Sequence, residues 1–164
     1  MALQCNKIQI DNPEKLDPFE PDWCRLARRG RWPTHRLEWA QSVVACLVPN
    51  DSGPLNIFMV RRNGRISALA AMQHQRKDDW NGLINLGYIT GEPTDLLYET
   101  RADALALLQS MLTFCPRLMF SRLPEESVVP SLALKLHSKK CSIKIPSKGA
   151  YPSIDLLLPE FCTE

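Results

Sequence analysis

The chain has 164 residues, of which 45% are hydrophobic and 23% charged, a balance that fits one globular domain and excludes a disordered protein. Its 20 basic and 18 acidic side chains leave a net charge of +2, so charge alone indicates neither a nucleic-acid nor a membrane partner. No apolar run is long enough to cross a membrane and the N-terminus lacks a signal-peptide pattern, so we expect a cytoplasmic protein.

Two helices are predicted to lead the chain. Acidic residues dominate from 11 to 22 and basic residues from 25 to 36, an order that complements a helix dipole, and Gly30 would end this first helix. Thr34 is expected to be the N-cap of a second helix. The apolar positions of that helix recur at helical spacing from Leu37 to Leu47, before Pro49.

Two segments rich in β-forming residues follow, 55–62 and 65–75, and Asn63 and Gly64 separate them. Asn-Gly between such segments is the strongest short-range signal of a β-hairpin, because both residues tolerate the positive φ of a type I′ turn. The alanine- and methionine-rich composition of 66–75 leaves a helix there as the alternative.

The second half of the chain alternates strands with helices. Short buried strands are expected at 82–87 and 95–98, followed by a helix that Thr100 caps and Pro116 ends. A strand at 118–121, a helix with Pro130 in its first turn, and strands at 141–145 and 153–158 complete the order. This pattern predicts an α/β domain of three layers, with a mixed, largely antiparallel central sheet and helices on its faces.

The motifs of common catalytic and cofactor sites are absent from the sequence. It contains no G-x-G-x-x-G, no P-loop, no G-x-S-x-G and no H-E-x-x-H. The six cysteines are far apart and form no C-x-x-C pair, so we expect no metal site. The sequence by itself requires no cofactor and assigns no catalytic residue.

One segment could hold a phosphate group and so bind a cofactor: Arg61, Arg62, Asn63, Gly64 and Arg65. If a helix began after this segment, backbone amides freed by the glycine could bind a pyrophosphate. The acyl-CoA loop of acetyltransferases is similar, with the pattern [RQ]-x-x-G-x-[GA]. Ile66 stands at the last position of that pattern here, so a plain hairpin is the favoured interpretation.

The expected strands could bring His74, Glu92, Asp95 and Tyr98 near one sheet edge, and Trp80, at a loop or strand edge, could also line a groove. The candidate residues of a substrate groove are His74, Trp80, Asp95 and Tyr98. Structural roles are favoured for two of them, with Asp95 capping a turn and the Tyr98 hydroxyl hydrogen-bonded. A lysine tract at 135–148 could follow a phosphate backbone, but no aromatic residue interleaves with it. An exposed surface is therefore favoured there, and nucleic acid is not an expected partner.

Several segments together carry a resemblance: 23–27, 32–34 with 38–40, 57–72, 87–98, 121–127 and 154–159. In pattern and order they resemble the first half of CelD-like acetyltransferases, a family associated with cellulose biosynthesis. The resemblance implies a single GNAT-like domain over residues 1–164, with its core from about residue 18 to 159. Its topology would splay two adjacent strands to admit the pantetheine arm of a cofactor.

Proteins of that family are built as two tandem GNAT-type domains, with the acyl-CoA loop in the second. The resemblance therefore implies the non-catalytic half of an acyl-CoA-dependent N-acyltransferase, which shapes a substrate groove with a second domain or subunit. Acetyl-CoA is the cofactor that it makes possible. The alternative is a stand-alone binding module for a protein or nucleic-acid partner, without catalysis.

The apolar sequence near the C-terminal end predicts that the protein self-associates. Three consecutive leucines in a terminal strand place apolar side chains on both of its faces. The residues concerned are Leu156, Leu157, Leu158 and Phe161. A homodimer that pairs these terminal strands is expected, and the alternative is a central strand buried on both sides within one chain.

Overall fold

The computed structural model describes residues 3–30, 32–47, 55–77, 80–86, 90–137, 142–144 and 154–157. The N-terminal elements are β1 (Gln4–Ile10), the 3-10 helix η1 (Pro13–Phe19), α1 (Glu20–Ala27), the 3-10 helix η2 (Pro33–His35) and α2 (Leu37–Leu47). The central strands are β2 (Leu55–Arg62), β3 (Arg65–Lys77), β4 (Trp80–Asn85) and β5 (Leu97–Tyr98). They are followed by α4 (Arg101–Phe114), β6 (Arg117–Phe120), α5 (Val129–His137), β7 (Ser142–Lys144) and β8 (Ile154–Leu157).

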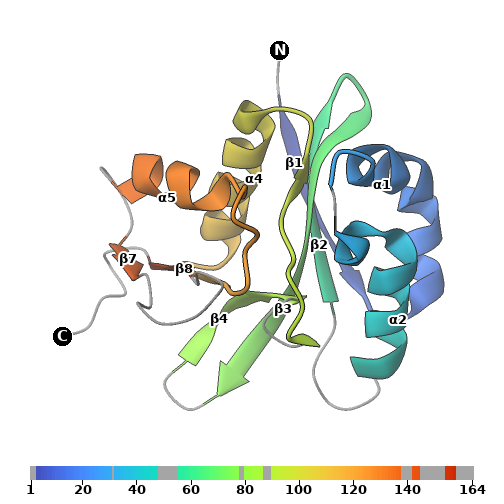
Figure 1. The fold of residues 1–164 in the computed structure, drawn as a ribbon, viewed down its shortest axis with the longest axis horizontal. Coiled ribbons are helices and arrows are strands. Elements are labelled where there is room, and N and C mark those ends of the chain that lie inside the picture. Colours follow the sequence, from blue (N-terminus) through green and yellow to red (C-terminus); the bar gives the residue numbers. More distant parts are fainter. Residues whose placement is uncertain are drawn as a thin grey trace.

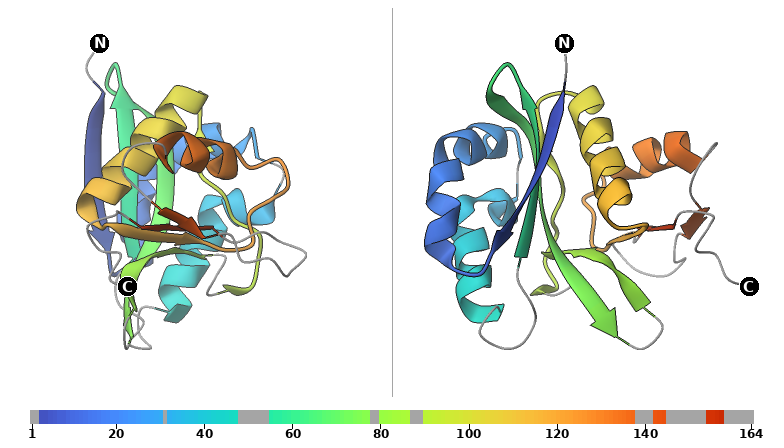
Figure 2. Two further views of the ribbon diagram at one scale, coloured as in Figure 1. Left: turned by 90° about the vertical axis from the view of Figure 1, so that its left-hand side faces the viewer. Right: turned by 180° about the vertical axis from the view of Figure 1, so that it is seen from behind.

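The strands form one sheet in the order β1-β2-β3-β4-β6-β8-β7, and β5 pairs with β3 beside this path. Every pair is antiparallel except β4 with β6. The helices α1 and α2 cover one face of the sheet, and α4 and α5 lie on the other (Figures 1 and 2). Each face buries its own apolar cluster. The predicted three-layer α/β fold with a largely antiparallel sheet is thus confirmed.

The strand β1 was not expected, so the prediction that two helices lead the chain is wrong. This strand lies at the edge of the sheet, and of its seven residues only Ile10 is buried. An edge strand exposed on both faces has little hydrophobic alternation for a sequence analysis to detect. Ile10 and Leu16 are fully buried, so the packed core begins before residue 18.

The hairpin of β2 and β3 is confirmed, with Arg62 opposite Arg65. Asn63 and Gly64 have φ values of 53° and 80°, as a type I′ turn requires. Residues 65–77 form a strand, so the helix start on which the phosphate-loop interpretation depended is not there. That the hairpin residues contact a cofactor remains an untested prediction.

The first two helices differ in their starts from the expectation. Pro18 and Pro21 divide the first into η1 and α1, because proline cannot donate the backbone hydrogen bond of a helix interior. Thr34 does not cap α2. It lies in η2, and its hydroxyl donates to the carbonyl oxygen of Pro93, so α2 begins at Leu37.

The strands β4 and β5 both pair with β3, but a long bulge separates them. Asn85 of β4 lies opposite Met72, and Leu97 of β5 lies opposite Leu69. Between these two pairs β3 has only residues 70 and 71, whereas the chain from β4 to β5 has the eleven residues 86–96. Residues 94–97, at the end of this excursion, form one wall of the site described below.

The strand β8 lies between β6 and β7 and pairs with both. Its described residues offer no free edge, and the predicted homodimer remains untested. Leu158 and Phe161 lie outside the described residues. Within the described parts of the chain, no helix has the length and apolar character needed to span a membrane.

Replacing Gly64 by alanine should lower the free energy of unfolding by about 1 kcal/mol, because a Cβ strains a residue at positive φ. Nothing lies within 4 Å of the added Cβ, so the cost comes from the backbone and not from a clash. Urea denaturation measures it, with Asn63→Gly as the control, since glycine accepts the same φ. Equal stability of Gly64→Ala and the wild type would contradict the turn geometry.

Candidate functional site

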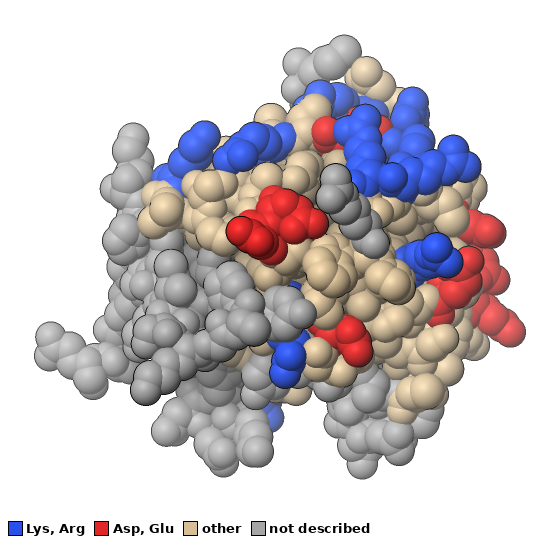
Figure 3. Space-filling model, in the orientation of Figure 1, with Lys and Arg blue, Asp and Glu red and all other residues tan. Residues whose placement is uncertain are grey.

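A groove of about 390 Å³ opens between the C-terminal end of α1, the segment that enters α4, and the loop between β6 and α5. Its polar and aromatic lining residues are Arg29, Trp32, His35, Asp95, Tyr98, Glu99 and Glu126. Lysine and arginine side chains gather around the end of α1 and the β2–β3 hairpin, in the upper part of the surface in Figure 3. The groove therefore has an acidic interior beside a basic rim.

Asp95 is the acidic group set deepest in this groove. Its Oδ1 accepts hydrogen bonds from the Leu96 amide at 2.8 Å and from the Ser127 hydroxyl at 2.9 Å. Burial raises the pKa of Asp95 to about 6, and the nearby charge of Glu126 acts in the same direction. Burial also raises the pKa of Tyr98, with a further contribution from the Asp95 charge.

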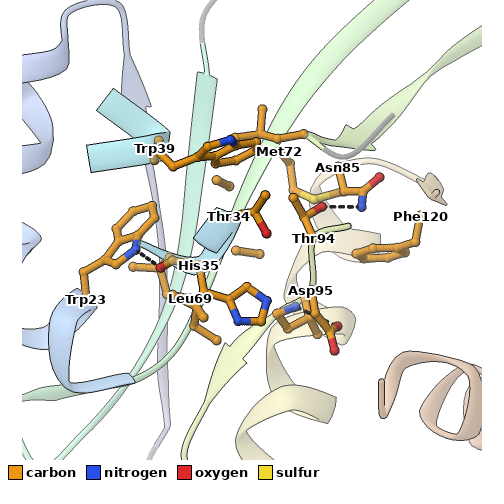
Figure 4. A pocket seen from close by; sticks show the side chains of 16 residues that line it. Trp23, Thr34, His35, Trp39, Leu69, Met72, Asn85, Thr94, Asp95 and Phe120 are labelled. Atoms are coloured by element: carbon orange, nitrogen blue, oxygen red, sulfur yellow. Dashed lines mark hydrogen bonds between the residues drawn. The ribbon is translucent and has the colours of Figure 1, made fainter. Parts of the chain in front are cut away.

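His35 lies at the floor of the groove and is only 8% exposed. Neither of its ring nitrogens has a hydrogen-bond partner, although the Trp23 indole donates to its backbone oxygen at 2.8 Å. Burial lowers the pKa of this imidazole, which favours the neutral ring. Figure 4, drawn around the smaller cavity behind the groove, shows the His35 ring beside Asp95, whose carboxyl group points away from the ring.

The fit of His35 depends on a glycine five residues earlier. A Cβ placed on Gly30 would lie 1.9 Å from Nδ1 of His35, a distance that real atoms cannot adopt. Both residues line the groove. The absence of a side chain at position 30 is therefore what allows the imidazole to occupy this position.

Behind the groove, the gap between β4 and β6 is closed by Asn85, which is 4% exposed. These parallel strands pair only at two positions before they diverge. The Asn85 amide nitrogen donates to Thr94 Oγ1 at 2.8 Å and to the Ser121 carbonyl at 2.9 Å, and its oxygen accepts from the Ser121 amide at 2.9 Å. A cavity beside Asn85, lined mainly by residues of η2, α2, β3 and the segment 94–97, measures about 30 Å³, which is space for one or two water molecules.

The N-terminus of α4 is satisfied by the chain itself. Thr100 is the N-cap, and its side chain and that of Asp103 form a reciprocal capping box. Asp103 is fully buried and accepts hydrogen bonds from Arg62 at 2.6 Å and from Ser67 at 3.1 Å. A carboxylate thus occupies the position at which a helix N-terminus would attract an external anion.

The structure brings together two of the four residues expected in a substrate groove. Asp95 and Tyr98 line it. His74 lies far along β3, where its ring is 2.8 Å from the Asn81 side chain, and the backbone of Trp80 pairs with Lys77 at the end of that hairpin. His74 does not line the groove. Among the described residues no cluster of histidine, cysteine and acidic side chains could hold a metal ion.

Sequence reasoning missed the residues on the opposite wall: Arg29, Trp32, His35 and Glu126. Only Gly30 and the nearby proline hinted that this loop has a constrained shape. Of the arginine-rich hairpin, Arg62 reaches Asp103 and Arg65 reaches Glu99 at 3.3 Å, while Arg61 bonds to the carbonyl of Gly64.

We expect the change that Asp95→Asn causes in the free energy of unfolding to be about 2–3 kcal/mol more favourable at pH 8 than at pH 4. The folded-state pKa lies above the unfolded value of 3.8. The unfolded chain therefore releases this proton first, and stability falls as pH rises from about 4 to 6. Asparagine keeps the bonds at Oδ1 and does not ionise. Urea denaturation across this pH range measures the difference, and parallel pH profiles of the two proteins would refute it.

Gly30→Ala should destabilise the protein by about 2 kcal/mol or more, because the new methyl group displaces the His35 ring. Thermal denaturation measures the loss, and the double variant Gly30→Ala with His35→Ala should recover part of it. If the two changes were additive, Gly30 and His35 would not be in the contact described.

No protein-family model and no curated protein sequence matches this chain. Solved structures do resemble it. The ribosomal-protein-S18-alanine N-acetyltransferase of Escherichia coli matches with a TM-score of 0.55 and 15% identity, over 99% of this chain and 97% of that one. An acetyltransferase of the GNAT family from Streptococcus agalactiae matches with a TM-score of 0.54 and 11% identity, over 96% and 95%.

A third structure, the PaiA N-acetyltransferase of Thermoplasma acidophilum, was solved in complex with coenzyme A. It matches with a TM-score of 0.51 and 11% identity, over 96% of this chain and 99% of that one. At such identities the likeness concerns the fold. The chain has the fold of the GNAT acetyltransferases.

Proposed function

We propose that this chain is a GNAT-fold domain that shapes a substrate groove without holding acyl-CoA itself. In the arrangement that its resemblance to CelD-like proteins implies, a second domain or a second subunit supplies the acyl donor and the catalytic groups. The observation that carries the proposal is the buried carboxylate of Asp103 at the N-terminus of α4.

The α4 N-terminus is a poor fit for the pyrophosphate of coenzyme A. A helix start binds phosphate through free backbone amides and its positive dipole end. Here the amides of Thr100 and Asp103 already donate to the capping-box side chains, at 3.2 Å each. The two residues that lead into the helix, Glu99 and Thr100, include no glycine through which a phosphate could approach the backbone. The amides of Thr100 and Asp103 are therefore not free to bind a phosphate, and the buried charge of Asp103 offsets the positive end of the helix.

The space between β4 and β6 is a poor fit for the pantetheine arm. The Asn85 side chain bridges the ends of β4 and β6 through two hydrogen bonds with the Ser121 backbone, where the arm would have to pass. Opening the gap would break the two part-buried hydrogen bonds between Asn85 and Ser121, each at a cost of about 1–3 kcal/mol. Both observations support a domain that takes part in substrate binding and not in binding of the acyl donor.

A second candidate is a stand-alone binding module that performs no chemistry with any partner domain. It is favoured by the groove itself, to which three separate segments of this chain contribute described lining residues. The two candidates share the prediction that acetyl-CoA does not bind. They differ in whether a second subunit or domain is needed.

Isothermal titration of the protein with acetyl-CoA should show no binding up to about 1 mM ligand, equivalent to a binding free energy weaker than about 4 kcal/mol. A GNAT enzyme of similar fold, such as the Escherichia coli S18-alanine N-acetyltransferase, serves as the positive control. Micromolar binding by this chain would overturn the proposal. Light scattering then separates the candidates, because a dimer favours a second subunit.

A further inference from the structure

We infer that the outer edge of β1 (Gln4–Ile10) pairs with the same edge of a second copy of this chain, antiparallel and centred on Asn6. The two sheets then form one continuous sheet across a twofold axis. The inference goes beyond the proposed function, which leaves the second subunit unidentified. It does not depend on whether acetyl-CoA binds.

The strand β1 ends the sheet on one side, as the left view of Figure 2 shows. Among the described strands, only β2 pairs with it. In an antiparallel edge strand, every second residue directs its backbone N–H and C=O groups away from the sheet. The described residues therefore leave a row of backbone donors and acceptors that a further strand can use.

The sequence of β1 lacks most of the features that keep edge strands apart. Such strands are commonly protected by short length, proline, bulges or several charges. This strand has seven residues, no proline and one charge, that of Lys7. All seven residues pair with β2 in one continuous register, so no bulge bends the edge. The strand is therefore long and regular enough to receive a partner strand.

Exposed apolar side chains gather at the same edge. In the described parts of the chain, four large hydrophobic side chains are exposed: Leu3, Ile8, Phe114 and Leu134. Leu3 directly precedes β1 and Ile8 belongs to it. Phe114 lies against it, because Nζ of Lys7 is 3.8 Å from the centroid of its ring. Apolar groups that cluster on a surface are typical of protein interfaces, so this edge favours a protein partner.

Charge selects the register of the pair. A twofold antiparallel pair of identical strands places one residue opposite itself. With Lys7 at that position, two like charges would stand directly opposite each other, which is unfavourable. With Asn6 there, Lys7 lies opposite the partner's Cys5 and the two ammonium groups are offset. The Asn6 amide has both donors and an acceptor, so it can bond to its own copy.

The extent of pairing favours the same register. Centred on Asn6, the two strands can pair over residues 3–9. A centre at Ile8 leaves only residues 6–10, because β1 ends at Ile10. Two further side chains of the strand, Gln4 and Gln9, also carry amides that donate and accept. A strand of this composition matches a copy of itself better than a strand of one charge sign.

Engineered disulfides test the register. In a Cys5→Ser background, Asn6→Cys should crosslink two chains on mild oxidation. Its Cα atoms would lie about 4.5–5.5 Å apart across the axis, within the range of a disulfide. Gln4→Cys and Ile8→Cys in the same background are the controls. Each would lie four residues from its own copy along the pair, about 13 Å away, and should not crosslink.

Mass spectrometry of the digested dimer identifies which cysteines are bonded, and so separates these crosslinks from those of other cysteines. Absence of a crosslink at position 6 would overturn the inference. Crosslinking at position 4 or 8 that equals or exceeds that at position 6 would also overturn it.

Sedimentation velocity tests the association itself. We expect the unmodified protein to dimerise with a Kd on the order of 10 µM, as suits a small interface. Ile8→Lys should weaken dimerisation about tenfold or more, because a second lysine opposes pairing at an edge. The matched control is Leu134→Lys, which alters the exposed leucine of α5 and should leave the Kd unchanged.

Circular dichroism and thermal denaturation establish that both variants are folded. A protein that remains monomeric at about 100 µM would overturn the inference, and so would an equal loss of dimer in the two variants. Acetyl-CoA is absent from these experiments, so their failure is distinct from failure of the proposed function.

Discussion

The buried carboxylate of Asp103 connects three elements of the central layer. It accepts from Arg62 of β2 and Ser67 of β3, and it closes the capping box with Thr100 at the start of α4. Removing one partner of such a buried charge costs about 3–5 kcal/mol, because the other is left without compensation. The hairpin, the sheet and the longest helix are therefore fixed relative to one another by one side chain, and the groove inherits its shape from them.

The position of Asp95 in the site depends on the long bulge between β4 and β5. A regular strand would have continued opposite residues 70 and 71 of β3, with side chains alternating between the two cores. Instead, residues 93–96 meet the loop after α1, where the Thr34 hydroxyl donates to the Pro93 oxygen. That contact brings Asp95 to the same space as His35, from a segment 60 residues away in the chain.

The features that the sequence predicted well are those with a local cause. Asn63-Gly64 determines its own turn and Thr100 caps its own helix, and both can be recognised without knowledge of the rest of the fold. The edge strand β1 was missed because its stability comes from pairing with β2, which is distant in sequence. Asp95 and Tyr98 were found as candidates, since both fall within one short segment before a helix.

Residues that meet only through the fold could not be found in this way. His35, Glu126 and Trp32 come from separate loops, and no spacing relates them to Asp95. His74 was expected with Asp95 because both belong to neighbouring strands. Register decides the matter, however: His74 pairs opposite Leu83, whereas Tyr98 pairs opposite Ala68, six residues along the same strand. At about 3.3 Å per residue, the positions of His74 and Tyr98 along β3 are about 20 Å apart.

The groove also concentrates groups that a purely structural surface would not retain. An imidazole without partners and a carboxyl group whose pKa is raised to about 6 by burial both lower the stability of the folded chain at neutral pH. Elsewhere, the buried side chains of Asn85 and Asp103 make three or more hydrogen bonds each. Perturbed and unsatisfied groups that gather in one hollow are typical of functional sites. The contrast within one molecule is therefore an argument that His35 and Asp95 are kept for a ligand, and that the closed gap behind them is not where that ligand enters.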